Sequence, residues 1–337
     1  MVLWAVAVLG CGTDAPAHEP RTIERLRERS VEVTCASVEG FAMNHAVVED
    51  LHAVSDTTFL ALFPLDRVVT LFDDRLEPVF SLSFEENGPR GVESPRAATV
   101  VDDTLVYFAD LGSRSVRILS RSGEDRGTIR TGFAPDGIRA GPSGVVLTAF
   151  PMALGVRDDL VYELDADGPR PLGLRMDPYD DPRVAALGNL LEVTVLPDGT
   201  VVAAHQTLSS RAALFRRRPQ GGFDVHVTTV PVSASEGERL GEVPTDLFER
   251  ENIGDLAAPV IAASVDRNSG EYLYLTRTGR AFPAGGTEKA IVRARPDLSY
   301  VESYRLDVNA QDFVYLADAE AVLVVDQEAA WHRCALR

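Results

Sequence analysis

The sequence predicts an all-β fold, a six-bladed β-propeller with four antiparallel strands in each blade. From residue 31 onward, strand-like runs with a period of two follow one another, and no long amphipathic helix interrupts them. A hairpin with a polar or glycine-containing turn recurs six times, at intervals of roughly fifty residues. The last of these units has too few strands to stand alone. A repeated unit that is incomplete at its end is typical of a ring of blades closed by the N-terminus.

Each hairpin joins the first strand of a unit to its second strand. The six hairpins read HAVSDTTFLALF, ATVVDDTLVYFAD, GIRAGPSGVVLTAF, VTVLPDGTVVAAHQ, AASVDRNSGEYLYLTR and FVYLADAEAVLVVDQ. Third and fourth strands follow in the first five units. VYFAD at 106–110 is therefore a second strand, whereas the similar VYLAD at 314–318 is a first strand. This assignment predicts that Asp110 and Asp318 lie on opposite faces of the ring.

The last unit offers only DFVYLAD, AVLVVDQ and AWHRCALR, so it lacks a fourth strand. The unassigned segment VEVTCASVEG at 31–40 is expected to supply it, because this leaves the ring without a free edge. Cys35 would then lie on the strand beside Cys334, and a disulfide between them would tie the ring shut. Two buried free thiols are the alternative. The propeller is thus expected to span residues 31–337.

The first eleven residues, MVLWAVAVLGC, are apolar and end at a cysteine. They resemble the lipobox of bacterial lipoproteins, in which a signal peptide is cleaved before a cysteine that becomes lipidated. The resemblance implies a signal peptide at 1–10, lipidation of Cys11, and a tether at 11–30 containing at most an exposed helical turn or two. The run is short and no positive charge precedes it, so an untargeted apolar N-terminus is the alternative. It is too short to span a bilayer as a helix.

Charge and cysteine content limit the compartment and the partners. The net charge of −18 excludes nucleic acid and anionic membrane surfaces as partners, since both require a basic surface. Contact with a membrane is expected only through the lipid anchor. Once Cys11 is set aside, the remaining pair of cysteines fits an oxidising compartment. We therefore expect a location in the bacterial cell envelope, on its periplasmic or extracellular side.

One repeat resembles a known family. Residues 84–124, FEENGPRGVESPRAATVVDDTLVYFADLGSRSVRILSRSGE, resemble an NHL-type repeat of the NHL/TolB-like propeller superfamily. Asp110, Gly112 and Arg114 match the turn of that repeat, and Ser113 replaces its usual Asn. With Cys11, the whole chain resembles the six-bladed propeller lipoproteins of bacterial envelopes. The resemblance implies a fold, but propellers of this kind have many different activities.

In a propeller, the loops from fourth to first strands and from second to third strands gather on one face, here called the loop-rich face. Binding residues tend to lie on such loops. Our candidates for ligand binding share this position: Arg90, Asp110, Arg114, Asp177, Tyr179, Asp180, Asp181, His205 and Arg280. This mixture of acids, arginines and a tyrosine favours a small polar ligand or a protein partner.

Each candidate has a structural alternative. Asp110 suits a turn in which its side chain binds its own backbone, and His205 suits a buried structural histidine. Asp177, Asp180 and Asp181 supply the hard oxygen ligands that calcium prefers, but their spacing matches no known calcium loop, so a solvated acidic loop is favoured and no metal or other cofactor is expected.

Two functions remain open. HExxH, CxxC, GxSxG and Walker motifs are absent from the sequence, which weakens zinc hydrolase, redox, serine hydrolase and nucleotidase hypotheses. We favour a non-catalytic binding or scaffold protein over an enzyme, and no catalytic residue is assigned. The alternative is a metal-dependent, lactonase-like hydrolase or lyase at the mouth of the channel. Its ligands would come from Asp110, the 177–181 segment, Asn189 and His205.

Overall fold

The computed structural model describes residues 21–23, 30–40, 47–86, 91–142, 144–151, 159–177, 179–233, 237, 240–241, 257–281 and 287–336. The lipobox with Cys11, and the candidate Arg90, lie outside these residues. Arg280 lies in a described strand, but its side chain is outside the description. Within the described part, no helix is long and apolar enough to cross a membrane.

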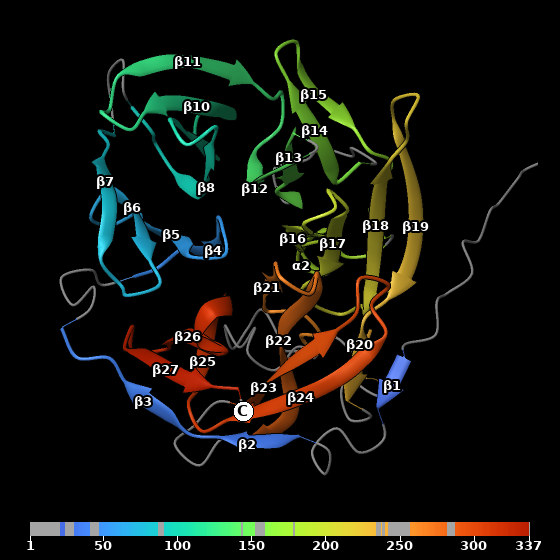
Figure 1. Ribbon diagram of the computed structural model, residues 1–337. Coiled ribbons are helices and arrows are strands. Elements are labelled where there is room, and N and C mark those ends of the chain that lie inside the picture. Colours follow the sequence, from blue (N-terminus) through green and yellow to red (C-terminus); the bar gives the residue numbers. More distant parts are fainter. Residues whose placement is uncertain are drawn as a thin grey trace, which may run out of the picture.

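Six antiparallel sheets form a ring of blades around a central channel, as predicted (Figure 1). Blade 1 contains β4 (Asp50–Ala53), β5 (Thr58–Phe63), β6 (Val68–Asp73) and β7 (Pro78–Ser83); blade 2 contains β8 (Pro95–Val101), β9 (Leu105–Asp110), β10 (Ser115–Ser120) and β11 (Asp125–Arg130). Blade 3 contains β12 (Pro135–Gly141), β13 (Gly144–Ala149), β14 (Val161–Asp165) and β15 (Gly168–Pro171); blade 4 contains β16 (Leu191–Val195), β17 (Val201–His205), β18 (Arg211–Arg217) and β19 (Phe223–Thr229).

The N-terminal part of the chain adds a fifth strand to blade 5 and supplies the fourth strand of blade 6. Blade 5 contains β21 (Ala262–Asp266), β22 (Glu271–Ala281), β23 (Thr287–Ala294) and β24 (Tyr300–Leu306), joined by β2 (Val31–Val33); blade 6 contains β25 (Ala310–Leu316), β26 (Ala321–Asp326), β27 (Trp331–Ala335) and β3 (Cys35–Ser37). In every blade the first strand of the unit lies innermost and faces the channel (Figure 1).

Position within the blade explains the sequence of each strand. The second strands β5 and β26 read TFLALF and AVLVVD and are buried along almost their whole length, because neighbouring blades pack on both of their faces. The outermost strand β11 reads DRGTIR and is largely exposed. Consequently the apolar core lies between blades, in clusters such as the one that joins blades 1 and 2 around Phe108.

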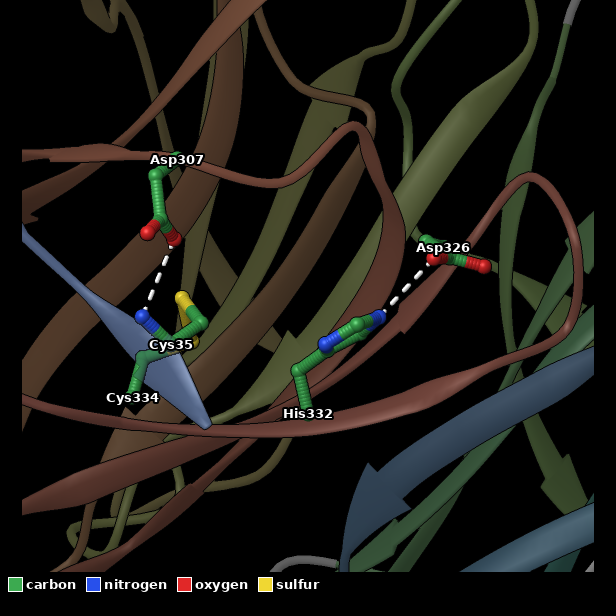
Figure 2. The surroundings of a disulfide bond; sticks show 5 residues. All are labelled: Cys35, Asp307, Asp326, His332 and Cys334. Atoms are coloured by element: carbon green, nitrogen blue, oxygen red, sulfur yellow. Dashed lines mark hydrogen bonds and ion pairs between the residues drawn. A yellow bond between two sulfur atoms is a disulfide. The ribbon is translucent and has the colours of Figure 1, made fainter. Parts of the chain in front are cut away.

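The N-terminal segment closes the ring as predicted, with one correction. Strand β3 pairs with β27 in antiparallel register and places Cys35 opposite Cys334, and the two cysteines form a disulfide with Cα atoms 4.2 Å apart (Figure 2). The backbone N–H of Cys35 also donates to Asp307 Oδ1 at 2.9 Å (Figure 2). Residues 31–33, expected in the same strand, instead pair in parallel with β24 of blade 5. The segment therefore seals two blade edges rather than one.

A further difference lies just before this segment. The tether at 11–30 was expected to contain at most an exposed helical turn or two, but Arg21–Ile23 form strand β1, which pairs in parallel with β20 (Pro231–Ser233). The reason is burial, because Ile23 is only 9% exposed and packs into the core between blades 4 and 5. Arg21 donates to Thr228 Oγ1 at 2.9 Å and so fixes the strand against blade 4.

The two similar VYxAD strands have the placement that the repeat predicts. Asp110 ends the second strand β9, whereas Asp318 lies in the short 3-10 helix η3 (Ala317–Ala319) that joins a first strand to a second. These connections belong to opposite faces of a propeller, so the similarity of the two strands is one of composition and not of position.

Candidate functional site

Charged side chains from the inner strands meet at the end of the channel that belongs to the loop-rich face. We call them the channel-mouth cluster. Its members are Glu49, Asp50, Arg96, Asp136, Arg139 and Glu192. They come from blades 1 to 4, and all but Arg139 come from the beginning of the first strand or the residue before it; Arg139 lies farther along β12. They surround a cavity of about 80 Å³, which Gln206 also lines.

The inner part of the cluster is centred on Arg139. Its guanidinium group crosses the channel and donates to both carboxylate oxygens of Asp50, at 2.8 and 3.2 Å. It also lies 3.4 Å from the carboxylate of Glu192. The side chains of Asp50, Arg139 and Glu192 are 7%, 9% and 15% exposed. Three blades are thus joined by one buried network, in which the fork of the arginine matches a carboxylate.

The outer part of the cluster is centred on Arg96. Its Nε donates to Asp136 Oδ1 at 3.1 Å, and one of its terminal nitrogens pairs with Glu49. The side chain of Arg96 is 38% exposed, so this part borders solvent. The face of the guanidinium group lies over the ring of Phe150, 5.8 Å from its centroid.

Carboxylates outnumber guanidinium groups in this part of the channel. Burial raises the pKa of Glu192 to about 7, and Arg139 offsets only part of that effect. Asp312, on the inner strand of blade 6, has its pKa raised well above the usual range by burial and by the charges of Glu192 and Asp50. For Asp50 the burial effect is outweighed by Arg139 and His52, which lower its pKa to about 2.

The remaining acids of the cluster show the same imbalance. Burial raises the pKa of Glu49 and that of Asp136, although Arg96 opposes the change in both. The four acidic side chains of the cluster therefore share two arginines, and Asp312 is a fifth acid close enough to interact with them. Ionising all of these acids would leave the mouth of the channel with an excess of negative charge, and a bound cation would favour their ionised forms.

Three of the predicted candidates come together at a second position, beside blade 4. Asp177 pairs with Arg211 and lies 3.8 Å from His205 Nε2. His205 is fully buried and its Nδ1 lies 2.8 Å from the carbonyl oxygen of Gly188. Burial lowers the pKa of His205, and burial and Asp177 raise that of Tyr179 to about 12.

The side chain of Asn189, a candidate ligand in the enzyme hypothesis, binds the backbone of Asp177. The Asn189 side chain accepts from the Asp177 N–H at 2.6 Å and donates to the Asp177 carbonyl oxygen at 3.0 Å. It also donates to the carbonyl oxygen of Ala185 at 2.7 Å. These bonds fix the 172–190 connection against blade 4, and they account for the buried position of Asn189.

The neighbouring acids Asp180 and Asp181 do not join Asp177. Asp181 is the N-cap of helix α2 (Pro182–Gly188), where its carboxylate accepts from the N–H of Arg183 at 2.7 Å and pairs with the Arg183 side chain. Asp180 is exposed. Among the described residues, no three His, Cys, Asp or Glu side chains are arranged to hold a metal ion. The residues that the structure describes therefore do not form a calcium-type site, and we derive no metal-dependent step.

Asp110 and Arg114 belong to the turn that resembles the NHL repeat. Asp110 is fully buried, and its carboxylate accepts from the N–H groups of Ser94 and Glu93 at 2.8 and 3.1 Å and from the hydroxyl of Ser113 at 2.6 Å. These bonds fix the loop that enters blade 2; the backbone groups that Asp110 binds belong to this loop and not, as the structural alternative expected, to its own turn. Arg114 lines an open groove of about 540 Å³ on blade 2. The ligand-binding role of both residues stays a prediction.

Sequence reasoning missed the channel-mouth cluster. It searched the loops, whereas the cluster lies on the inner strands. A signal was nevertheless present, because four of the six units place a charged residue at the first or second position of the first strand: Asp50, Arg96, Asp136 and Glu192. A charge that recurs at one position of a buried strand indicates a shared environment, and in a propeller that environment is the channel.

No protein-family model matches the chain, and no curated protein matches it in sequence. Solved structures match its fold over most of its length. A member of the DUF4221 family from Bacteroides vulgatus has a TM-score of 0.60 at 8% identity, with 91% of this chain and 96% of that chain covered. Regucalcin from Agrobacterium tumefaciens, described as a calcium-binding protein, has a TM-score of 0.54 at 10% identity, with 90% and 95% covered.

A gluconolactonase from Xanthomonas campestris has a TM-score of 0.52 at 15% identity, with 94% of this chain and 95% of that chain covered. Identities this low establish a shared fold and nothing more specific. The chain is therefore an all-β, six-bladed propeller, structurally related to proteins that include both an enzyme and a member of a family of unknown function.

Proposed function

We propose that the protein is an envelope-anchored, non-catalytic binding propeller that holds a cationic polar group at the mouth of its channel. One observation carries the proposal. Four acidic side chains converge there from three blades, and only two arginines accompany them, so not all four acids can be ionised and paired in the absence of a further cation. Burying unpaired charge is costly, and a bound ammonium or guanidinium group would offset that cost while donating hydrogen bonds.

The size of the cavity limits what enters it. About 80 Å³ admits a cationic head group but not a whole cofactor-sized molecule. The rest of the ligand would lie on the loop-rich face. Both a small polar molecule and the Lys or Arg side chain of a protein partner meet this description. We propose no catalytic step.

The binding proposal is tested with simple cations. Isothermal titration calorimetry would measure the binding of guanidinium and of ethylammonium to the protein. Both would be added as gluconate salts, and urea would be the uncharged control. We expect a dissociation constant of about 0.1–10 mM for at least one cation at pH 8, the range open to ligands of so few atoms. Binding should strengthen as the pH rises through about 7, because Glu192 then loses its proton and gains charge.

A matched pair of variants locates the site. Glu192→Gln should weaken cation binding by about tenfold at pH 8 and remove most of its pH dependence, because a charged partner is lost. Glu124→Gln, at an exposed position of blade 2, should change neither. Failure of every cation to bind, or equal binding by both variants, would refute the proposed site.

The anchor is proposed on separate grounds. The lipobox-like sequence before Cys11 supports it, and the disulfide between Cys35 and Cys334 supports an oxidising compartment. On expression in a bacterium, the wild-type chain should fractionate with membranes and carry added lipid mass at Cys11. Cys11→Ser should be released and unmodified. A wild-type chain without lipid would refute this part of the proposal alone.

A further inference from the structure

A second cavity lies deeper in the channel, on the other side of Arg139 from the mouth. Its volume is about 30 Å³, enough for a single small ion or one water molecule. Its polar lining consists of His52, Thr99, Arg139, Thr194 and Arg267. Arg267 follows the inner strand of blade 5 and lies in the hairpin between its first and second strands. This end of the channel therefore belongs to the face opposite the loop-rich face. Acidic side chains are absent from the described lining, in contrast to the channel mouth.

Nitrogen atoms that lack a hydrogen-bond partner gather around this cavity. Besides Nδ1 of His52, which faces Asp50, they are Nε of Arg139, Nε of Arg267 and Nε2 of His52, each buried and each from a different blade. His52 and Arg139 are 5% and 7% exposed. Buried polar atoms in native proteins are almost always satisfied, so three on the lining of one cavity indicate a missing partner. Two of the three always carry a hydrogen, and therefore the missing partner is an acceptor.

The ionisable side chains that line the cavity are all basic, although the acids Asp50 and Asp56 act on them from outside the lining. Burial lowers the pKa of His52 and Arg139 lowers it further, while Asp50 opposes the change and Arg267 adds to it. Burial likewise lowers the pKa of Arg267. Arg267 is held in place by a bond from its Nη2 to the carbonyl oxygen of Ala53, at 3.3 Å. Two guanidinium groups thus face one small, largely dehydrated space, and an anion would offset their repulsion.

We propose that the cavity between His52, Arg139 and Arg267 is a binding site for a small monovalent anion of the size of chloride. The volume excludes phosphate and sulfate, and the two guanidinium groups supply charge-assisted donors. The channel then has a cation site at its mouth and an anion site below it, with Arg139 between them. The anion site does not depend on the proposed ligand of the mouth.

Anion binding should take up a proton on His52. Nδ1 of His52 lies 3.4 Å from Asp50 Oδ2, so a proton on that nitrogen faces a carboxylate and Nε2 is then free to act as an acceptor. An anion beside Nε2 requires a second proton there, and the imidazolium would donate to Asp50 and to the anion. Other ionisable groups face His52 from the elements packed around it: Arg139 of β12, Arg267 after β21, and, beyond Arg139, Glu192 of β16 and Asp312 of β25.

The test uses the whole chain in sodium gluconate, because the gluconate anion is too large for the cavity. Chloride would be added at constant ionic strength, and binding followed by the line width of the ³⁵Cl NMR signal and by the melting temperature. We expect protein-dependent broadening that bromide reverses by competition. We also expect a melting temperature that rises with the logarithm of chloride concentration, as ligand linkage requires. Chloride affinity should be higher at pH 6 than at pH 8.

Variants assign the effect to the cavity. Arg267→Gln should weaken chloride binding at least tenfold, whereas Arg295→Gln, at an exposed position of blade 5, should leave it unchanged. Circular dichroism in gluconate checks that Arg267→Gln folds; if it does not, Thr194→Val, which removes a lining hydroxyl group, should weaken binding severalfold. In Glu192→Gln the pH dependence of chloride binding should persist, because it arises from protonation of His52. No chloride-specific response in the wild type, or an unchanged response in the cavity variants, would assign the cavity to water and overturn the proposal.

Discussion

Cys35→Ser is expected to lower the free energy of unfolding by about 4–5 kcal/mol, at the upper end of what disulfides contribute, because the loop that it closes is very long. The disulfide links residues 299 positions apart, so it restrains nearly the whole unfolded chain. Strand β3, which it anchors, pairs with β27 through only three register positions. Without the bond, the ring is closed by this short strand and by β2 alone.

Urea denaturation of the oxidised, reduced and variant proteins measures this effect. Reduction of the wild type should reproduce the loss, and reductant should have no effect on Cys35→Ser. Cys35 is the better position to change, since Cys334 is fully buried and its replacement adds a second cost. A loss below about 1 kcal/mol would mean that β2 and β3 hold the ring closed without the covalent bond.

Arg139→Met is expected to lower the free energy of unfolding by about 3–5 kcal/mol at pH 8, the cost of leaving buried charges without their partner. Asp50 loses its bidentate partner and Glu192 its nearest cation. In the variant the pKa of Asp50 should rise, since Arg139 is the strongest of the interactions that lower it. Asp50 then takes up a proton more readily in the folded variant. The loss of stability caused by Arg139→Met should therefore shrink as the pH falls toward 5.

Two comparisons separate this effect from a loss of packing. Arg183→Met removes an exposed ion pair with Asp181 and should cost less than about 1 kcal/mol. Adding Asp50→Asn to Arg139→Met should restore part of the stability, because it removes the charge left unpaired. If the double variant is less stable than Arg139→Met, the network acts through hydrogen bonds and shape rather than through charge.

Much of the fold could be predicted because it is encoded locally. Turn residues and a period of two mark each hairpin, and the hairpins repeat along the chain. The incomplete last unit and the spare strand at 31–40 then predicted ring closure and placed Cys35 beside Cys334, which the structure confirms. That inference needed only a count of strands and the requirement that no edge stay free.

The candidate site was predictable in part. The 177–181 loop and His205 were placed on the same face, and the structure brings Asp177, Tyr179 and His205 into one group through Arg211 and the bonds of Asn189. It separates Asp181 from them, since an aspartate before a proline at the start of a helix serves as an N-cap. Such a cap depends on local sequence, and reading the loop only as an acidic surface overlooked it.

The sequence by itself determined the blades, their number and the closure of the ring, because strand period, turn chemistry and strand count are properties of neighbouring residues. Only the tertiary structure decided that residues 31–33 seal blade 5, and that Asp50, Arg139 and Glu192 share one buried network. The physical reason is that an open sheet edge and a dehydrated channel exist only once distant strands have assembled. A charged residue on an inner strand has no special property until the other five blades remove it from water.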